Sequence, residues 1–293
     1  MRTRAQPLSQ SKVVALATPP KPAVSAVEMG ARQREISVSE FFTKNRHLLG
    51  FDNPRKALLT CVKEAVDNAL DACEEAGILP DVVVKVEAVA NGEPPPPASQ
   101  ASRFRITVAD NGPGIVRQQI PPIFAKLLYG SKFHRLRMSR GQQGIGISAA
   151  GMYGQLTTGK PVQIISRTSA RAPAHYFEVQ IDTKKNEPRI LEKKQIAWDS
   201  PRGTQVTMEV EGRYQKGRAS VDEYIEQTII ANAHVKLTYL MPEGRAQGVS
   251  PDLRPAPFPA TRDQAASVWH RAGDAAQDAP GHQESFAGRI PGR

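Results

Sequence analysis

The sequence predicts an α/β protein, a two-layer sandwich with a mixed β-sheet. Helix-period patterns of apolar residues occur at 54–76, 120–128, 147–153 and 221–233. Strand patterns occur at 82–89, 104–109, 162–167, 176–181, 204–211 and 235–240. Helices thus precede and interrupt a run of strands, most of which follow one another closely enough to pair as hairpins. That order favours helices packed on a sheet of mixed strand direction.

The helix predicted over 54–76 is the clearest element of the chain. Asn53 can cap it, Pro54 suits its first turn and Gly77 is placed to end it. Its apolar stripe consists of Leu58, Val62, Ala65, Val66, Ala69, Leu70 and Cys73. A polar stripe on the opposite face consists of Glu64, Asp67, Asn68 and Asp71. Such a stripe is commonly only the solvated side of a helix, so it indicates no function by itself.

The remaining patterns divide the chain into three segments. Residues 1–36 are polar and basic without a period, and we expect a disordered basic arm. Residues 37–244 carry the predicted folded domain, which opens with a short helical segment at 38–49 and includes a capping box of Ser220 and Glu223. Residues 245–293 are rich in Pro, Ala, Gly and Gln, and we expect them to be disordered or foreign to the fold.

Composition narrows the class of protein. The net charge of +10 over 293 residues suits a polyanionic partner, whether nucleotide, nucleic acid or an acidic membrane face, although a solvated basic surface gives the same number. No apolar run approaches the ~18 residues of a membrane span. Cys61 and Cys73 lie about three turns apart on one predicted helix, too far for a disulfide. We therefore expect a soluble cytoplasmic protein.

The polar stripe of the 54–76 helix could serve phosphoanhydride hydrolysis. That reaction needs a base that orients and deprotonates water, together with a divalent cation on the phosphates. Glu64 and Asn68 are one helical turn apart and face the same volume. A carboxylate there can hold water, while the amide oxygen can ligate Mg²⁺, which takes few protein ligands. Asp67 and Asp71 are more typical of solvation or of support behind the ligands.

Two glycine segments could complete a nucleotide site. Asp110 ends a predicted strand, and its acceptor-only carboxylate can read the exocyclic amine of adenine. Gly112 and Gly114 would let the backbone approach the base, although the segment also suits an ordinary turn. The loop 141–146 leads into a helix, where free backbone N–H groups can hold phosphate oxygens. The basic segment 126–140 before it is either a lid that attracts triphosphate or a solvated loop.

Other nucleotide-binding patterns are missing from the sequence. No glycine-rich stretch ends in Gly-Lys-Ser or Gly-Lys-Thr, which excludes a Walker-type loop. The glycine loop also lies far from any early βαβ unit, which argues against a dinucleotide-binding domain. The four motifs therefore suggest ATP chemistry on another scaffold.

In that order, the motifs resemble the GHKL (Bergerat-fold) ATPase domain shared by gyrases, heat-shock-ninety chaperones, histidine kinases and MutL. The resemblance is strongest to the B subunits of DNA topoisomerase VI. Residues 41–47 and 50–54 are similar to that family's N-terminal strap, which we place at about 37–53. Residues 125–133 and 140–148 are similar to its lid, and the similarity runs over roughly residues 36 to 243.

Residue by residue, the resemblance implies that Glu64 is the general base and that Asn68 is the ligand of Mg²⁺ and ATP. It implies that Asp110 binds adenine, with Thr204 hydrogen-bonding through water nearby. Ser131 and Lys132 would close on the nucleotide. The phosphates would be wrapped by Gly141, Gln142, Gln143, Gly144, Ile145, Gly146, Ile147 and Ser148.

The sequence also departs from this family. Members of that family continue with a helix-two-turn-helix module and a transducer domain, which supplies a lysine to the γ-phosphate, and we expect this chain to lack both. No lysine follows Lys236. The loss of pattern near Arg245 suggests a truncation or a frame change in the coding sequence. The frame change is tested by reading the genomic DNA after codon 244 in another frame. If no other frame encodes a transducer-like sequence, the frame change is excluded.

Three functions follow from the resemblance. The first is the ATPase subunit, or a fragment of it, of a type IIB topoisomerase that relaxes duplex DNA by ATP-gated double-strand passage. Its partners would be the topoisomerase VI A subunit, DNA, and a second copy joined through the strap when ATP binds. The alternative is an ATP-binding module that dimerises with little or no turnover. A histidine-kinase domain is disfavoured, because Glu64 supplies a water-activating base that a kinase must avoid.

Overall fold

The computed structural model describes residues 26–31, 36–89, 101–130, 145–242 and 246–249. The chain divides into two units, Met1–Ile36 and Ser37–Arg293. The described element of the first unit is α1 (Ala26–Ala31), a helix inside the arm for which the sequence predicts none. A six-residue helix is too short to leave a periodic apolar pattern, which explains why it escaped prediction. All other described elements belong to the second unit.

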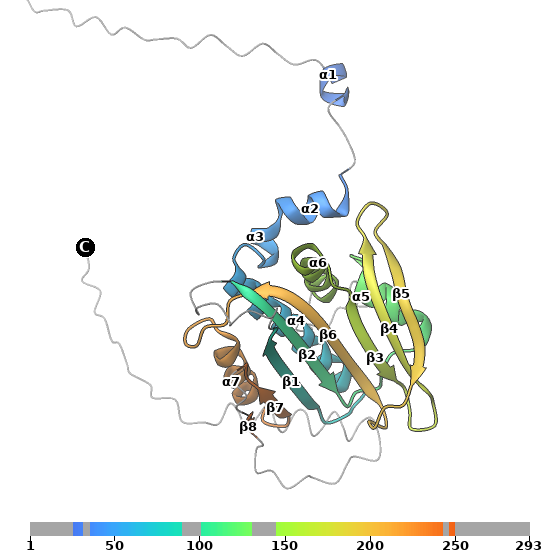
Figure 1. Cartoon of the computed structure of the whole chain (residues 1–293), viewed down its shortest axis with the longest axis vertical. Coiled ribbons are helices and arrows are strands. Elements are labelled where there is room, and N and C mark those ends of the chain that lie inside the picture. Colours follow the sequence, from blue (N-terminus) through green and yellow to red (C-terminus); the bar gives the residue numbers. More distant parts are fainter. Residues whose placement is uncertain (1–25, 32–35, 90–100, 131–144, 243–245, 250–293) are drawn as a thin grey trace, which may run out of the picture. The chain divides into compact units, whose positions relative to one another are not determined.

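Eight strands form one sheet in the order β5-β4-β3-β6-β2-β1-β7-β8 (Figure 1). Their bounds are β1 (Asp81–Ala88), β2 (Ser102–Asp110), β3 (Val162–Arg167), β4 (Ala174–Asp182), β5 (Glu187–Ile196), β6 (Gly203–Gly212), β7 (Lys236–Leu240) and β8 (Ala246–Val249). Strand β7 runs parallel to β1, whereas the other neighbouring pairs are antiparallel. The predicted mixed sheet is confirmed.

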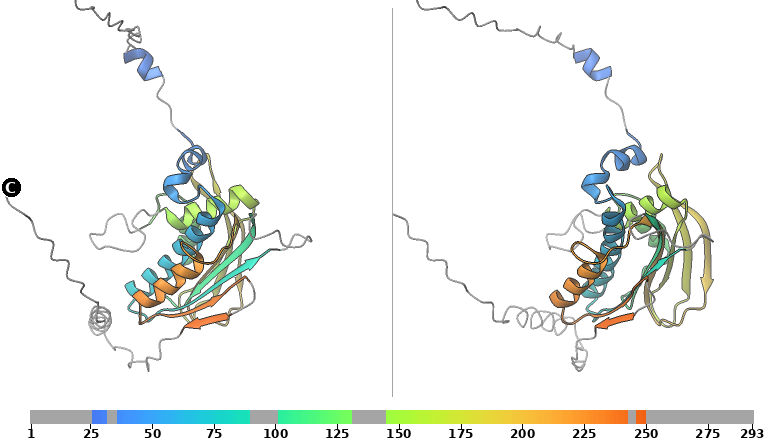
Figure 2. Two further views of the ribbon diagram at one scale, coloured as in Figure 1. Left: turned by 90° about the vertical axis from the view of Figure 1, so that its left-hand side faces the viewer. Right: turned by 60° about the vertical axis from the view of Figure 1, so that its left-hand side comes forward.

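Helices cover one face of this sheet, so the two-layer prediction is also confirmed (Figure 2). The helices of this unit are α2 (Val38–Lys44), α3 (Arg46–Leu49), α4 (Pro54–Glu75), the 3-10 turn η1 (Arg117–Gln119), α5 (Ile120–Ala125), α6 (Gly146–Thr158) and α7 (Val221–Ala231). Helix α4 packs on β2 and β6, α6 on β6, and α5 on β4 and β5.

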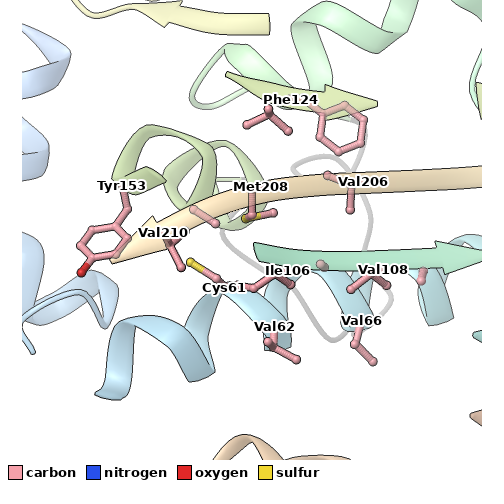
Figure 3. Close-up of a cluster of buried hydrophobic side chains, with 14 of the residues drawn as sticks. Cys61, Val62, Val66, Ile106, Val108, Phe124, Tyr153, Val206, Met208 and Val210 are labelled. Carbon is pink, nitrogen blue, oxygen red and sulfur yellow. The ribbon is translucent and has the colours of Figure 1, made fainter. Parts of the chain in front are cut away.

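The long helix α4 forms as its sequence predicts. The Asn53 side chain accepts a hydrogen bond from Lys56 N at 2.9 Å, Pro54 opens the helix, and Gly77 follows its end with φ +66°. Its apolar stripe faces the sheet. Figure 3 shows the resulting core, in which α4 meets β2, β6 and α6 through Cys61, Val62, Val66, Ile106, Val108, Tyr153, Val206, Met208 and Val210. Both cysteines are buried and free.

Strand β5 was missed by the sequence patterns. It forms the outer edge of the sheet beside β4, with a register shift between Glu178 and Val179. Nearly all of its side chains are exposed, including Ile190 and Leu191 at 43% and 44%. Because neither face of the strand is buried, no alternation of apolar and polar residues marks it in the sequence.

Three further predictions differ from the structure. The helix predicted at 38–49 is broken at Asn45, whose side-chain Nδ2 donates to Phe41 O. The helix predicted at 120–128 ends at Ala125, and Leu128 then has φ +60°. Strand β8 lies in the tail for which no element is expected, and it pairs with β7 through Leu237 and Val249. Backbone pairing needs no side-chain pattern, so the composition of the tail did not reveal it.

Candidate functional site

The first part of the site is the turn that follows β2. The Asp110 carboxylate accepts hydrogen bonds from two backbone amides, Gly112 N at 2.8 Å and Thr204 N at 3.1 Å, both at Oδ1. A side chain on Gly112 would meet this oxygen at 2.8 Å and Cys73 Sγ at 3.3 Å. The strand end, the turn and the start of β6 therefore fix the orientation of one carboxylate.

Glycine backbone lets the neighbouring strands approach this turn. Gly203 has φ +123°, and a Cβ on it would lie 2.0 Å from Asp110 O. Gly114 has φ +69°, and a Cβ there would lie 2.2 Å from Arg167 O at the end of β3. Two separate features require glycine at each position. One is the positive φ, and the other is the contact with main-chain atoms, which cannot rotate away.

A buried hydroxyl pair supports the same turn. Ser166 is fully buried; its hydroxyl lies 3.1 Å from Thr204 Oγ1, donates to Gly203 O at 3.1 Å and accepts from Ile115 N at 2.8 Å. The Thr204 side chain thus faces Ser166, while its backbone amide serves Asp110. Sequence reasoning missed Ser166, because a single serine in a strand carries no signal before β3 and β6 are known to pair.

Asn111, the residue beside Asp110, ties the turn to the start of β1. Its Oδ1 accepts from Asp81 N at 2.9 Å and its Nδ2 donates to Leu79 O at 3.1 Å. Cys73 Sγ on α4 donates to the same Oδ1 at 3.5 Å. This role was also missed, since the asparagine reads as a turn residue in the sequence.

Burial raises the pKa of Asp110 from its ordinary value of 3.8 to about 6, against the lowering effect of the Gly112 and Thr204 amides. The side chain is therefore held in position but poorly solvated. A bound group that donates a hydrogen bond to the carboxylate would compensate for the lost water.

The second part of the site lies where α6 begins against α4. A Cβ built on Gly146 would lie 1.7 Å from Glu64 Oε2 and 2.4 Å from Glu64 Cδ. No residue larger than glycine fits there while Glu64 keeps this rotamer. The structure therefore brings the predicted base to the first residue of the helix that follows the glycine loop.

The other residues of this helix start are also placed. Ile145 precedes the helix, its carbonyl accepts from Ala149 N at 2.7 Å, and Ser148 Oγ donates to the same oxygen at 3.1 Å. Ser148 is 1% exposed, and Ile147 is half-buried against the core. The Ser148 hydroxyl thus donates to a carbonyl within the first turn of its own helix.

The polar stripe of α4 is not uniform. Asn68 and Glu64 are half-buried, whereas Asp67 and Asp71 are only 5% and 6% exposed. Asp67 accepts from Tyr224 OH of α7 at 2.8 Å and pairs with Lys63 Nζ. Of the two expectations for Asp67 and Asp71, burial contradicts solvation and leaves support behind the ligands as the prediction; α7 packs against this helix.

Six of the predicted nucleotide contacts lie outside the described residues: Ser131, Lys132, Gly141, Gln142, Gln143 and Gly144. Within the described part of the chain, no group of three or more His, Cys, Asp or Glu side chains could hold a metal ion. In that same part, no helix has the length and apolar character to cross a bilayer.

Comparison with known proteins gives a family and several relatives. The family model described as histidine kinase-, DNA gyrase B- and HSP90-like ATPase matches residues 53–213. Among solved structures, the Aquifex aeolicus MutL ATPase domain complexed with ADP aligns with a TM-score of 0.39 and 18% identity, over 64% of this chain and 61% of that one.

Three curated relatives are named as the B subunit of type 2 DNA topoisomerase 6. The protein from Archaeoglobus fulgidus is 54% identical over 217 residues, which are 74% of this chain and 34% of the relative. That from Methanosarcina mazei is 52% identical over 76% of this chain and 34% of the relative. The protein from Natronomonas pharaonis is 49% identical over 74% of this chain and 26% of the relative. The chain thus spans about a quarter to a third of the length of these relatives.

Proposed function

The chain belongs to the family of histidine kinase-, DNA gyrase B- and HSP90-like ATPases, and on this premise we propose that residues 37–244 bind ATP with Mg²⁺ and hydrolyse it. The domain would be the ATPase domain of the B subunit of a type IIB DNA topoisomerase, which relaxes DNA by ATP-gated double-strand passage. Relatives about half identical to this chain bear that subunit's name, which supports the proposal.

The contact between Glu64 and Gly146 carries the hydrolytic part of this proposal. The amino-terminal end of α6 is a favourable place for phosphate oxygens, because its first N–H groups have no partner within the helix. Glu64 lies directly against the first residue of that helix. A water molecule held by the carboxylate would therefore sit beside the terminal phosphate, where a base is needed.

Asp110 would define the opposite end of the nucleotide. Its carboxylate offers only acceptors when ionised, which matches the exocyclic amine of adenine. The two backbone amides leave Oδ2 without a hydrogen bond from them, since both donate to Oδ1. Gly112 and Gly114 keep side chains away from the adjoining backbone. The Thr204 amide donates a hydrogen bond to the carboxylate and so helps to hold it in place.

The described residues fit a magnesium ion that is held mainly by the nucleotide. Asn68 lies one turn from Glu64 on α4 and is half-buried. One amide oxygen together with phosphate oxygens and water suits Mg²⁺, which is seldom caged by protein alone. When bound, the ion would neutralise charge on the phosphates, while Asn68 would orient it. Ser131, Lys132 and the loop 141–148 would complete the contacts to the phosphates.

The partners of the full-length relatives are proposed for this chain as well. We expect the topoisomerase VI A subunit, duplex DNA, and a second copy that exchanges the strap when ATP binds. Exposed apolar side chains on the strap support the last of these, since Phe41 is 41% and Leu48 72% exposed. A cytoplasmic location is proposed for such an enzyme.

Two measurements on wild type and Glu64→Ala test the proposal: the rate of ATP turnover, and the binding of a non-hydrolysable ATP analogue with Mg²⁺. Loss of a general base predicts a fall in turnover of about 100-fold or more with binding retained. Glu74→Gln on the same helix is the control and should turn over like wild type. Turnover that survives Glu64→Ala would remove Glu64 from the role of base.

Two other outcomes decide between the functions. Analogue binding by the wild type without any turnover would favour the ATP-binding, dimerising module over the enzyme. A wild type that binds no nucleotide would contradict the proposed function altogether.

A further inference from the structure

Ser166, near the end of β3, uses every hydrogen-bonding position of its hydroxyl group. A serine hydroxyl has one hydrogen to donate and two lone pairs that accept. Ser166 Oγ lies 2.8 Å from Ile115 N, 3.1 Å from Gly203 O and 3.1 Å from Thr204 Oγ1, and the side chain is fully buried. The contacts of this hydroxyl therefore equal its capacity to form hydrogen bonds.

The chemistry of the partners fixes the direction of each bond. Ile115 N only donates and Gly203 O only accepts, so Ser166 gives its one hydrogen to Gly203 and receives one from Ile115. Either oxygen could donate in the contact with Thr204, which then needs the hydrogen of Thr204. This assignment alone makes all of these contacts hydrogen bonds, and burial favours it because an unpaired buried polar group costs free energy.

The Thr204 hydroxyl consequently offers a ligand lone pairs only. Its one hydrogen is directed at Ser166, which leaves Oγ1 with acceptor capacity and no donor. A threonine hydroxyl without such a partner would rotate and either donate or accept, as the ligand requires. Ser166 thus sets the hydrogen-bonding polarity of the neighbouring side chain.

This hydroxyl belongs to the Asp110 end of the candidate site. Thr204 N donates to Asp110 Oδ1 at 3.1 Å. Covalent geometry keeps Thr204 Oγ1 within about 4 Å of its own N, so the hydroxyl and carboxylate oxygens lie within about 7 Å of each other. One base edge, alone or with one water molecule, spans that distance. Since an ionised carboxylate is also acceptor-only, both groups require hydrogens from the ligand.

We propose that Ser166 is a positioning residue for base selection: it fixes the Thr204 hydroxyl as an acceptor, so that Thr204 and Asp110 together favour a base edge that donates hydrogens. The inference rests on the proposed function and adds to it a second source of selectivity for adenine. Adenine carries an exocyclic amine where guanine and hypoxanthine carry a carbonyl oxygen. Ser166 acts only through Thr204 and does not contact the base.

Base preference is measured as the ratio of two dissociation constants, for a non-hydrolysable ATP analogue and for its inosine counterpart, each with Mg²⁺. The full chain is used at about pH 8, where Asp110, with a pKa of about 6, is ionised. Wild type should prefer the ATP analogue about 100-fold or more. In Ser166→Ala the Thr204 hydrogen is released toward the ligand, so this preference should fall about five- to tenfold.

A second variant and a matched control accompany Ser166→Ala. Ser166→Cys keeps a similar size but bonds weakly, so the preference should fall in the same direction by a smaller factor. Thr107→Val is the control, because Thr107 Oγ1 also lies 3.1 Å from a hydroxyl on β6, that of Thr207, outside the Asp110 turn. Valine replaces that hydroxyl with a methyl group, and the preference should stay that of wild type.

Thr204→Val separates control of polarity from simple support of the turn. Once the Thr204 hydroxyl is removed, Ser166 has no hydrogen to fix. Adding Ser166→Ala should therefore leave the preference of Thr204→Val unchanged. A further fall in the double variant would show that Ser166 only braces the turn, and it would overturn the proposal.

The outcomes distinguish this inference from the proposed function. Wild-type preference in both Ser166→Ala and Ser166→Cys would overturn the role of Ser166 while leaving ATP binding intact. If wild-type protein binds neither analogue, the proposed function falls and the role of Ser166 falls with it.

Discussion

The two ends of the candidate site are built in different ways. At the Asp110 end, backbone from β2, β3 and β6 converges on one turn, with Gly203 and Gly114 at positive φ and Ser166 buried between strands. At the Glu64 end, one flexible side chain lies against one glycine at the start of α6. At the first end, main-chain atoms pack against main-chain atoms, whereas at the second end a side chain packs against the main chain.

This difference predicts how each end responds to change. A main-chain contact cannot relax by rotating a side chain, so an added methyl group must move strands and disturb the fold. A glutamate side chain can adopt other staggered rotamers, so an added methyl group there should displace the proposed base without unfolding the protein. The Asp110 end should fail through stability, and the Glu64 end through activity.

The largest effect is expected for Gly203→Ala. At φ +123° the new Cβ would lie 2.0 Å from Asp110 O, 2.9 Å from Asp110 C and 3.2 Å from Asn111 Cα. Strain and overpacking together should lower the free energy of unfolding by about 3 kcal/mol or more in urea titrations. Gly217→Ala is the control, because Gly217 has φ +95° with no atom near its Cβ position. It should lose only about 1 kcal/mol; equal losses would show that backbone conformation alone matters.

Because Asp110 titrates, the free energy of unfolding should change with pH by up to about 3 kcal/mol. Its folded pKa of about 6 exceeds the ordinary 3.8, so the folded state binds the proton more tightly than the unfolded state. The contribution to stability is therefore present below pH 3.8 and is lost as pH rises through 6. Urea unfolding of unliganded protein between about pH 4 and about pH 7.5 measures it. Asp110→Asn should flatten this part of the curve; an unchanged slope would assign the dependence to other groups.

The smallest effect on stability is expected for Gly146→Ala. The new methyl group would collide with Glu64 Oε2 at 1.7 Å, and the carboxylate can rotate away. The free energy of unfolding should change by less than about 1 kcal/mol, whereas turnover should fall about tenfold or more because the base is displaced. Gly151→Ala on the same helix meets Val162 Cγ2 instead and is the control for turnover. Wild-type turnover in Gly146→Ala would show that the observed Glu64 position is not needed.

Local chemistry explains which parts of the fold could be predicted. The Asn53 cap, Pro54 and the apolar stripe of α4 act within a few residues of one another, so the sequence contains the whole cause of that helix. Strand β5 has no such local cause. It forms because β4 offers an unpaired edge, and its exposed side chains carry no period.

The polar stripe of α4 shows the same division within one helix. Sequence spacing placed Glu64 and Asn68 on one face, and both are half-buried, with Glu64 beside the start of α6. For Asp67 and Asp71 on the same stripe, the sequence analysis expected solvation or support behind the ligands. The structure decides between these two expectations, because both acids are buried and Tyr224 OH of α7 donates to Asp67.

The sequence by itself determined the class of fold and the chemistry of the site: a mixed sheet with helices, a carboxylate and an amide one turn apart, and an aspartate at a strand end. These depend on residue type and short spacing. Tertiary structure decided that Gly146 lies against Glu64 and that Gly203 and Ser166 support the turn of Asp110. Such contacts join residues tens of positions apart, and their geometry exists only after the strands and helices have packed.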